Sequence, residues 1–463
     1  MDITDKGVMP VESPGIYFPQ DFYLKTLNFL SSSGQKTELK KIVREISYYE
    51  DIYTFTVSGY IKIEDAQGFI ERLQLTGNEY IELNFSKVKG APNKTDQLFR
   101  VYKIGDRKPS KNLNTDYYTM YFCSEELMLS EQKKISKSYK GMKVSDMISD
   151  ILTNQMSVES SKIDSIEETI GMYDFVIPRM KPFEAISWLS TYARPKATGG
   201  LGADMIFYET KDGFAFKSLQ SLFTQDSYGT YKYQQNNLGE KNEPMEERAM
   251  TVLNYEYKKT FDVVQDISSG SFANRLISID PLQRLFRTTD FNYNDFKDKA
   301  ESLNKDGVTN NLENRDGKKL YETADAVIKT ITSNANQVKN SYIQSKDGAG
   351  IAKDIFVEDY VPNRTAQLNL ANYTVLKLAI PGDPGLTAGK VIDFNLMNIK
   401  PQTKSRELDK FYSGRYLVTA VRHIIQPDES TYQTILEVAK DSSKTQPQMV
   451  NNADAVWMDG RDS

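Results

Sequence analysis

The chain contains 463 residues, with 39% apolar and 26% charged side chains, a composition typical of a globular protein of about three domains. Its net charge of −5 argues against general nucleic-acid binding, and its single cysteine, Cys123, excludes an internal disulfide framework. No stretch approaches the ~18 apolar residues of a membrane span, and the start, MDITDKGVMPVESPG, lacks the basic and apolar parts of a signal peptide. We therefore expect a soluble protein, made in a cytoplasm, without membrane insertion.

The first predicted domain follows an N-terminal arm at 1–16 and covers residues 17–125. In the stretch 80–86, YIELNFS, apolar and polar residues alternate with the period of two that is typical of a half-buried strand. Further strand-like stretches, divided by turn residues, lie at 52–63, 97–106 and 116–124. Several short strands at this spacing predict a small barrel or a sandwich.

The second predicted domain, 126–249, mixes helices and strands. The stretch KVSDMISDIL places apolar residues on one helical face with Ser145 as the N-cap, and KPFEAISWLSTYA begins a helix with Pro182 at its first position. The pair Asp212-Gly213 lies between two strand-like stretches and predicts a tight hairpin there. The pattern indicates an α+β domain.

Strand-like stretches return in two separated parts, 250–296 and 363–441. Between them, residues 297–362 form a polar insertion, with a helix expected at 321–343. The predicted fold class is therefore mainly β with α+β. It comprises strand-rich parts near both ends of the chain, an α+β domain and a polar, partly helical insertion.

Reactive side chains are scarce in this sequence. His423, the only histidine, lies in an expected strand and alternates with Leu417, Val421 and Ile425, so its face of that strand is largely apolar. The sequence has no Gly-x-Ser-x-Gly elbow to supply a nucleophile for a triad, and one histidine with one cysteine leaves no Cys/His zinc site. We predict structural roles for His423 and Cys123, and no catalytic, cofactor-binding or metal-binding residues.

Three stretches share turn and strand patterns with one protein family. In residues 264–296 a Gly-containing turn leads into a hairpin with an Asp-Pro tip, and residues 363–396 contain the motif IPGDPGLTAGKVI between two strands. Residues 411–442 read as a closing hairpin that carries the histidine as a strand residue. These patterns resemble those of the central baseplate hub proteins of contractile-tailed bacteriophages. The resemblance covers most of the chain apart from about 300–350 and both termini.

The resemblance implies a structural protein without enzymatic activity. In that family a hub carries two similar barrels, and three copies form a quasi-sixfold ring that joins a sixfold tail tube to a threefold spike. Here the resemblance implies two small antiparallel β-barrel domains, at 17–125 and at 250–296 combined with 363–441. The implied function is a homotrimeric hub of a phage tail baseplate that adapts one symmetry to the other and lines the genome-ejection channel.

The same resemblance implies the partners and the location. The partners are further copies of the chain, the central spike protein, the tail tube or tube-initiator protein, the baseplate wedge proteins, and DNA that passes through the lumen without specific binding. The location is the tail baseplate of a virion, after synthesis in the host bacterial cytoplasm. Two alternatives stay open: the hub of a phage-like protein-injection machine, and a tail-associated cell-wall hydrolase.

The last segment of the chain, 442–463, is a polar tail interrupted by Val456, Trp457 and Met458. A polar composition is typical of a segment that does not fold by itself. Tryptophan, however, is over-represented among the residues that anchor interfaces. Two interpretations follow: a disordered tail, or a tether whose Trp457 docks on the spike or on a neighbouring hub subunit. In the second, Val456, Trp457 and Met458 bind the partner.

Overall fold

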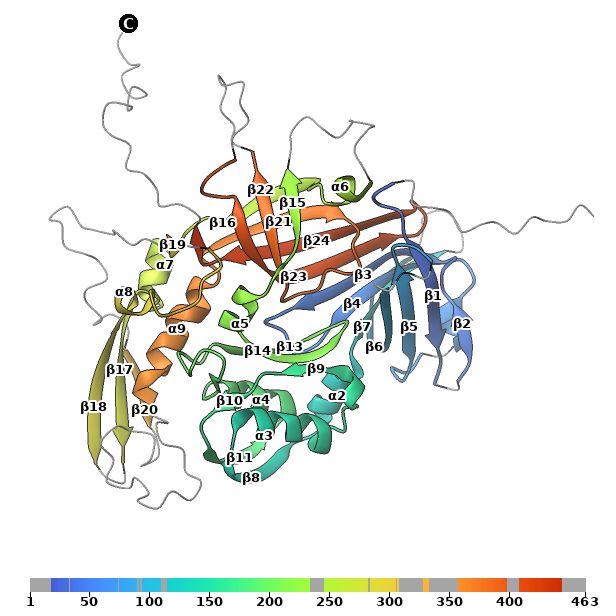
Figure 1. Cartoon of the computed structure of the whole chain (residues 1–463). Coiled ribbons are helices and arrows are strands. Elements are labelled where there is room, and N and C mark those ends of the chain that lie inside the picture. The colour runs from blue at the N-terminus through green and yellow to red at the C-terminus, as the bar shows by residue number, and fades with distance from the viewer. Residues whose placement is uncertain are drawn as a thin grey trace, which may run out of the picture.

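Most of the protein is built around one large sheet of 13 strands (Figure 1). The computed structural model describes residues 18–32, 34–73, 75–89, 91, 94–109, 115–233, 245–281, 284–304, 306–307, 328–332, 357–397 and 408–443. No helix in these ranges is long and apolar enough to cross a membrane. The predicted fold class, mainly β with an α+β part, is confirmed.

The N-terminal part of the chain forms the first half of the large sheet. Its elements are β1 (Tyr23–Leu30), β2 (Lys36–Glu38), β3 (Val43–Asp51), β4 (Ser58–Asp65), α1 (Phe69–Leu73), β5 (Tyr80–Ser86), β6 (Lys94–Pro109) and β7 (Asp116–Cys123). Ile81, Leu83 and Phe85 of β5 are buried, as their alternation predicted. All strands from β1 to β7 except β2 contribute side chains to one core, so this half of the sheet curves around it.

The second half of the large sheet comes mainly from the C-terminal part of the chain. Its elements are β15 (Ser227–Tyr233), α6 (Met245–Ala249), β16 (Asn254–Lys259), β21 (Thr374–Pro381), β22 (Val391–Leu396), β23 (Gly414–Gln426) and β24 (Thr431–Lys440). A bridge between Lys232 and Thr251 links β15 to the chain that enters β16. The second half is therefore closed on itself, around a core of its own.

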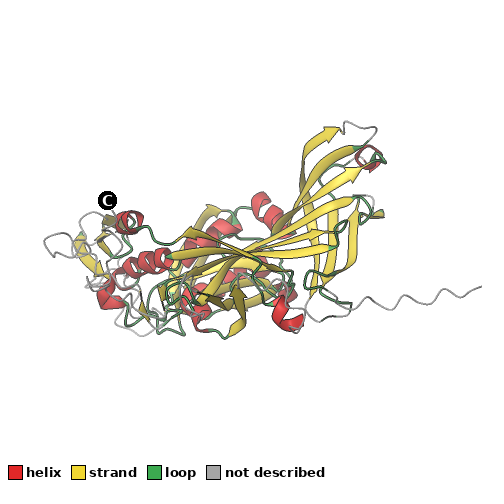
Figure 2. Ribbon diagram, turned by 90° about the horizontal axis from the view of Figure 1, so that it is seen from above, coloured by secondary structure: helices red, strands yellow, loops and turns green. Residues whose placement is uncertain are grey.

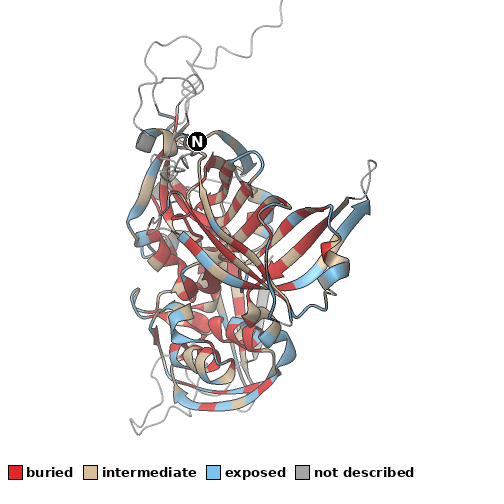
Figure 3. Ribbon diagram, turned by 90° about the vertical axis from the view of Figure 1, so that its right-hand side faces the viewer, coloured by how far each residue is buried: buried red, intermediate tan, exposed pale blue. Residues whose placement is uncertain are grey.

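Strands β3 and β23 join the two halves. They pair antiparallel from Ala420 opposite Asp51 to Ile425 opposite Ile46, and the main path runs β16-β21-β24-β23-β3-β4-β7-β6-β5-β1-β2. Figure 2 shows the long central strands passing from one half into the other. Buried residues alternate with more exposed ones along these strands (Figure 3). The residues predicted as two barrels therefore share one continuous sheet.

A third part, here called the α+β unit, spans residues 125–224 and packs beneath the large sheet (Figure 1). Its elements are α2 (Glu125–Gln132), β8 (Ile135–Met142), α3 (Val144–Asp150), η1 (Ile151–Gln155), η2 (Ser160–Lys162), β9 (Ile163–Ile166), β10 (Thr169–Ile170), β11 (Tyr173–Met180), α4 (Pro182–Ser190), β12 (Arg194–Pro195), β13 (Met205–Thr210), β14 (Gly213–Ser218) and α5 (Leu219–Thr224). It has a separate apolar core.

The local predictions for the α+β unit hold with two corrections. Pro182 does open α4. Ser145 does not cap α3, because that helix begins one residue earlier after Lys143, and the Ser145 amide donates instead to Thr169 Oγ1 at 3.0 Å. The predicted hairpin is present as β13 and β14, but its turn lies one residue earlier, since Gly213 with a φ of 126° already begins β14.

The remaining described elements form the α9 unit, at the left of Figure 1. They are α7 (Val263–Ser268), β17 (Ala273–Asp280), β18 (Leu285–Asn292), α8 (Tyr293–Phe296), β20 (Ile328–Thr332), η3 (Val357–Asp359) and α9 (Val361–Leu370). Nearby, β19 (Asp306–Gly307) pairs with β25 (Ser442–Ser443). Helix α9 begins beside Pro362, a residue favoured in the first turn of a helix.

Two expectations are corrected in the α9 unit. Strands β17 and β18 were assigned to the second barrel, but β17 pairs with β18 on one edge and β20 on the other, so neither joins the large sheet. The helix expected at 321–343 is wrong at 328–332, which is strand β20. Its sequence, IKTIT, is rich in β-branched residues that favour an extended backbone.

Candidate functional site

His423 lies in β23 with none of its surface exposed. Its Nδ1 lies 2.8 Å from the Tyr432 hydroxyl and 3.2 Å from Thr434 Oγ1, both within hydrogen-bonding distance. The rings of Tyr48 and Phe85 pack against the imidazole at centroid distances of 5.7 and 6.0 Å. Burial lowers the pKa of His423 to about 3, so the ring is neutral at physiological pH. This position favours a structural role.

The other candidates from the sequence give no reactive cluster. Cys123 is buried, and burial raises the pKa of its thiol to about 11, which keeps it protonated. Within the ranges that the structure describes, no three His, Cys, Asp or Glu residues are grouped so as to hold a metal ion. Val456, Trp457 and Met458 lie outside the described residues.

Glu50 is a buried carboxylate where three parts of the chain meet. It lies in β3 and is 1% exposed. The amide of Lys211, in the β13–β14 turn, donates to Oε1 at 2.7 Å, and the amide of Ala388, between β21 and β22, donates to Oε2 at 3.0 Å. The Tyr48 hydroxyl donates to Oε1 at 2.9 Å. Burial raises the pKa of Glu50 to about 7, although these donors oppose the shift.

Glu209 makes a second buried contact of the same kind. It lies in β13, and its Oε2 accepts hydrogen bonds from the Val57 amide at 2.9 Å and from the Ser124 hydroxyl. Val57 leads into β4, and Ser124 follows β7. Burial raises the pKa of Glu209 to about 8. Glu50 and Glu209, here called the carboxylate junction, together hold the β13–β14 hairpin against the large sheet.

The opposite face of the large sheet carries a row of tyrosines, here called the tyrosine ladder. Its members are Tyr102, Tyr121, Tyr60 and Tyr49, on β6, β7, β4 and β3, and successive ring centroids are 6.2, 6.1 and 6.1 Å apart. Arg422 of β23 extends the row, since its guanidinium lies 5.3 Å from the Tyr49 centroid. The ladder therefore crosses the join between the two halves.

Glu45 organises the charges beside this ladder. Its carboxylate pairs with Lys62 at 2.9 Å and with Arg422 at 3.4 Å, and it accepts a hydrogen bond from the Tyr60 hydroxyl at 2.7 Å. Burial alone would raise the pKa of Glu45, but the bonds from Tyr60 and Lys62 outweigh it and lower the pKa. Lys62 and Arg422 thus share one carboxylate, and Lys103, whose ammonium lies 5.0 Å from the Tyr121 ring centroid, adds a further cation to this face.

Sequence reasoning did not single out the junction or the ladder. Glu50 shares its strand parity with the buried Ile46 and Tyr48, so an acid in a core position was the available signal. Its partners are 161 and 338 residues away in the chain, which no local pattern reveals. Among the described residues, His423 is hydrogen-bonded to the hydroxyl groups of Tyr432 and Thr434 and to no carboxylate that could orient it as a base.

Comparisons with known proteins give one curated relative and several similar structures. No family model matches the sequence. The chain is 22% identical over 461 residues to the "Probable baseplate hub protein gp334" of Vibrio phage KVP40, covering 95% of this chain and 97% of that protein.

Two solved structures have the same overall fold. The 43 kDa tail protein of prophage MuSo2 from Shewanella oneidensis is 9% identical, covers 90% of this chain and 99% of its own, and has a TM-score of 0.52. The tail protein from Neisseria meningitidis MC58 is 10% identical, covers 91% of this chain and 97% of its own, and has a TM-score of 0.50. The predicted resemblance to phage baseplate hub proteins is thereby confirmed.

Proposed function

We propose that this chain, similar in sequence to a phage baseplate hub protein, forms the trimeric hub of a contractile tail baseplate. Its ring would adapt a sixfold tail tube to a threefold spike and line the genome-ejection channel. The observation that carries this proposal is the doubled sheet: one chain supplies two halves, each around its own core, joined by β3 and β23. Three such chains supply six halves, the number that a sixfold tube needs.

The tyrosine ladder suggests which face of the large sheet would line the channel. It lies on the first half and reaches β23 of the second through Arg422, so in a ring it would recur once in each of the three chains. Affinity for duplex DNA comes largely from cations that are free to neutralise phosphates. Here Lys62 and Arg422 are already paired with Glu45. This arrangement supports passage of DNA without specific binding.

The same proposal assigns the partners. The two halves would contact the tail tube or tube-initiator protein and the baseplate wedge proteins, while the α+β unit contacts neighbouring hub subunits and the central spike. The location would be the tail baseplate of the virion, after synthesis in the host cytoplasm. The name of the curated relative supports the baseplate location.

Imaging of assembled baseplates tests the stoichiometry. We expect three copies of the chain around an open passage, and mass photometry of the purified chain with its spike should give equal numbers of both proteins in a complex of three each. Six copies per baseplate, or a centre that stays closed after genome ejection, would contradict the proposal. Particles that carry protein cargo and no genome would identify the injection-machine alternative.

We propose no catalytic activity for the chain. A triad hydrolase would depend on the only histidine, and His423 is enclosed by Tyr48, Phe85 and Tyr432. Purified chain added to a suspension of host peptidoglycan should leave its turbidity and its soluble sugar content unchanged, beside lysozyme as a positive control. Release of glycan or peptide fragments by the chain would favour the cell-wall hydrolase.

A further inference from the structure

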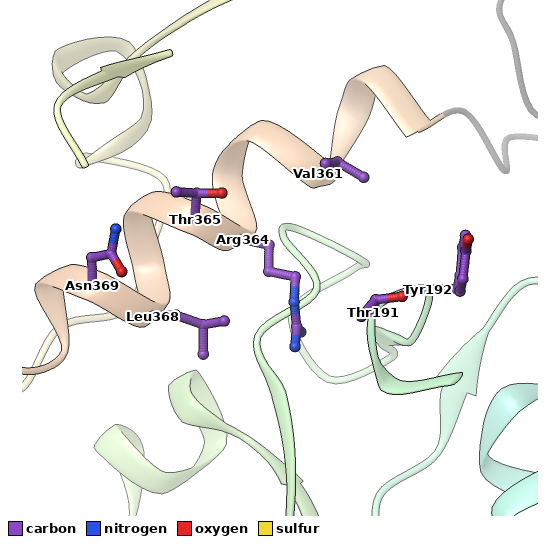
Figure 4. Close-up of a pocket in the computed structure, with 7 residues that line it drawn as sticks. All are labelled: Thr191, Tyr192, Val361, Arg364, Thr365, Leu368 and Asn369. Carbon is purple, nitrogen blue, oxygen red and sulfur yellow. The ribbon is translucent and has the colours of Figure 1, made fainter. Parts of the chain in front are cut away.

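A pocket lies between α9 and the residues that follow α4 (Figure 4). Its volume is about 430 Å³, within the range typical of ligand sites. One face of α9 lines it with Val361, Arg364 and Leu368, at the spacing of successive helical turns, and Thr191 and Tyr192 lie across from them. The pocket thus combines apolar walls with one cationic side chain.

Arg364 is the polar feature of this pocket. Its Nη1 donates to the carbonyl oxygens of Ser190, at 3.3 Å, and of Ala203. Its Nε and Nη2 have no acceptor among the described residues, and no carboxylate among them forms an ion pair with it. These two nitrogens form the side of a guanidinium that binds a carboxylate through two parallel hydrogen bonds.

The guanidinium stays charged although it is partly removed from water. Burial lowers the pKa of Arg364 to about 10, which is still well above neutral pH, and the nearest carboxylate that acts on it, Asp204, is itself buried. A half-buried cation without an anionic partner favours a ligand that supplies one. Tyr192, Val361 and Leu368 favour an apolar or aromatic group next to that anion.

The chain itself contains a segment with this chemistry. Val456, Trp457 and Met458 are followed directly by Asp459, so an aromatic anchor and a carboxylate lie two residues apart. The described chain leads into this segment from β25, which pairs with β19, and the Leu303 amide just before β19 donates to Asp441 at 3.1 Å.

The tail begins on the same side of the molecule as the pocket. Helix α8, a few residues before Leu303, packs on α9 through Phe296 and Ala366, so the tail starts on the α9 side of the molecule (Figure 1). Twelve residues lie between Ser443 and Val456, and the thirteen steps from one to the other span about 43 Å when the chain is extended.

We propose that the segment 456–459 of this chain docks in the α9 pocket, with Trp457 against the apolar wall and the Asp459 carboxylate on Nε and Nη2 of Arg364. The segment belongs either to the same copy or to a neighbouring one, and the pocket chemistry is the same in both cases. Docking of the segment does not require the hub function. If docking is disproved, the proposed hub function still stands, and if the hub function is disproved, docking still stands.

Photo-crosslinking of the full chain tests this docking. Benzoylphenylalanine placed at position 457 keeps an aromatic side chain there, and crosslinked peptides are then identified by mass spectrometry. We expect the crosslinks to concentrate on residues 361–369 and 191–192, within one chain or between two. Crosslinks spread over unrelated surfaces, or made only to another baseplate protein, would overturn the proposal.

Charge variants make the test specific. Arg364→Gln should lower the yield of these crosslinks about tenfold, because a charge-assisted pair is lost. Arg422→Gln, a matched arginine on the large sheet, should leave the yield unchanged. If Arg364→Gln does not fold, Asp459→Asn tests the same contact from the tail, outside every described core, and should give a similar loss. An unchanged yield in Asp459→Asn and Arg364→Gln would refute the pairing.

Discussion

Two of the contacts between the α+β unit and the rest of the molecule differ in how their polar groups are satisfied. At the carboxylate junction, Glu50 and Glu209 accept hydrogen bonds from groups of the large sheet and its loops. At the second place, where α9 lies against the loop around Gly202, here called the α9 contact, both polar atoms of the Gln367 amide and the Tyr360 hydroxyl are buried without a hydrogen-bond partner among the described residues.

The difference indicates that the two contacts are not equally strong. A buried polar group that keeps its hydrogen bonds contributes modestly to stability, whereas one that loses them costs about 1–3 kcal/mol. The carboxylate junction therefore fixes the β13–β14 hairpin on the large sheet, while the buried polar groups without partners weaken the α9 contact. We expect the α9 unit to separate from the α+β unit before the α+β unit separates from the large sheet.

The largest effect should come from removing a junction carboxylate. Glu50→Ala leaves the amides of Lys211 and Ala388 and the Tyr48 hydroxyl without their acceptor, and should lower the free energy of unfolding by about 4 kcal/mol. Glu45→Gln, on the solvent side of the same strand, is the control and should change it by less than about 1 kcal/mol. Urea denaturation at pH 7 measures both. Equal effects would mean that the junction does not hold the hairpin.

The junction should also make stability depend on pH. The folded-state pKa values of Glu50 and Glu209, about 7 and 8, lie above the ordinary value of 4.5, so the folded protein binds their protons more tightly than the unfolded chain. Stability is then greatest below pH 4.5 as far as these groups are concerned, and it falls as pH rises through 7 and 8. For Glu50 alone the fall is on the order of 3 kcal/mol. Denaturation curves at pH 5, 6, 7 and 8 should show it.

A neutral variant separates this effect from other titrating groups. The side chain at position 50 in Glu50→Gln has no proton to lose between pH 5 and pH 8. Wild type should therefore lose more stability than the variant over this range, and the variant should compare best with wild type at pH 8. A constant difference from pH 5 to pH 8 would show that Glu50 is ionised throughout.

At the α9 contact, the loss of a polar group should raise the stability of the protein, whereas at the carboxylate junction it lowers it. Gln367→Met removes two buried polar atoms that lack partners and keeps a similar shape, so it should stabilise the protein by about 1 kcal/mol. Glu50→Met, the same kind of change at the carboxylate junction, should destabilise it. Thermal melts of the two variants beside wild type test the pair. A loss of stability in Gln367→Met would remove the contrast between the two contacts.

The smallest effect on function should come from a residue that belongs to neither contact. His423→Gln replaces a neutral ring whose Nδ1 is hydrogen-bonded to the Tyr432 hydroxyl, and an amide group can donate or accept in its place. Assembly and infectivity should stay close to wild type at a permissive temperature, with a modest loss of thermal stability. Well-assembled particles that fail to infect would reveal a chemical role for His423.

Local patterns in the sequence were sufficient for individual elements. The alternation of Ile81, Leu83 and Phe85 identified a strand, and Pro182 identified the start of α4. Turn chemistry placed the β13–β14 hairpin within one residue, although its register depends on Gly213. These features depend on neighbouring residues and on backbone conformation, which the sequence displays directly.

The arrangement of those elements depended on contacts that the sequence does not display. Helix α9 was missed because its sequence, VPNRTAQLNL, is polar and has only a weak apolar face. A helix was expected at β20 because the surrounding sequence is polar. The strand itself, IKTIT, has four β-branched residues and pairs with β17. In both the small sheet and the large one, pairing with a strand that is distant in the chain decided which segments became strands and which sheet they joined.

The pairing of β3 with β23 has a consequence for biosynthesis. The first half of the large sheet begins at the N-terminus, yet its core includes Ile425 and Tyr432, and the Tyr432 amide donates to the Gln20 carbonyl. Ile425 and Tyr432 are synthesised long after the strands of the first half. The edge of β3 that pairs with β23 therefore stays unpaired until β23 has left the ribosome. The first half of the large sheet is thus made first but can complete its core only with residues made much later.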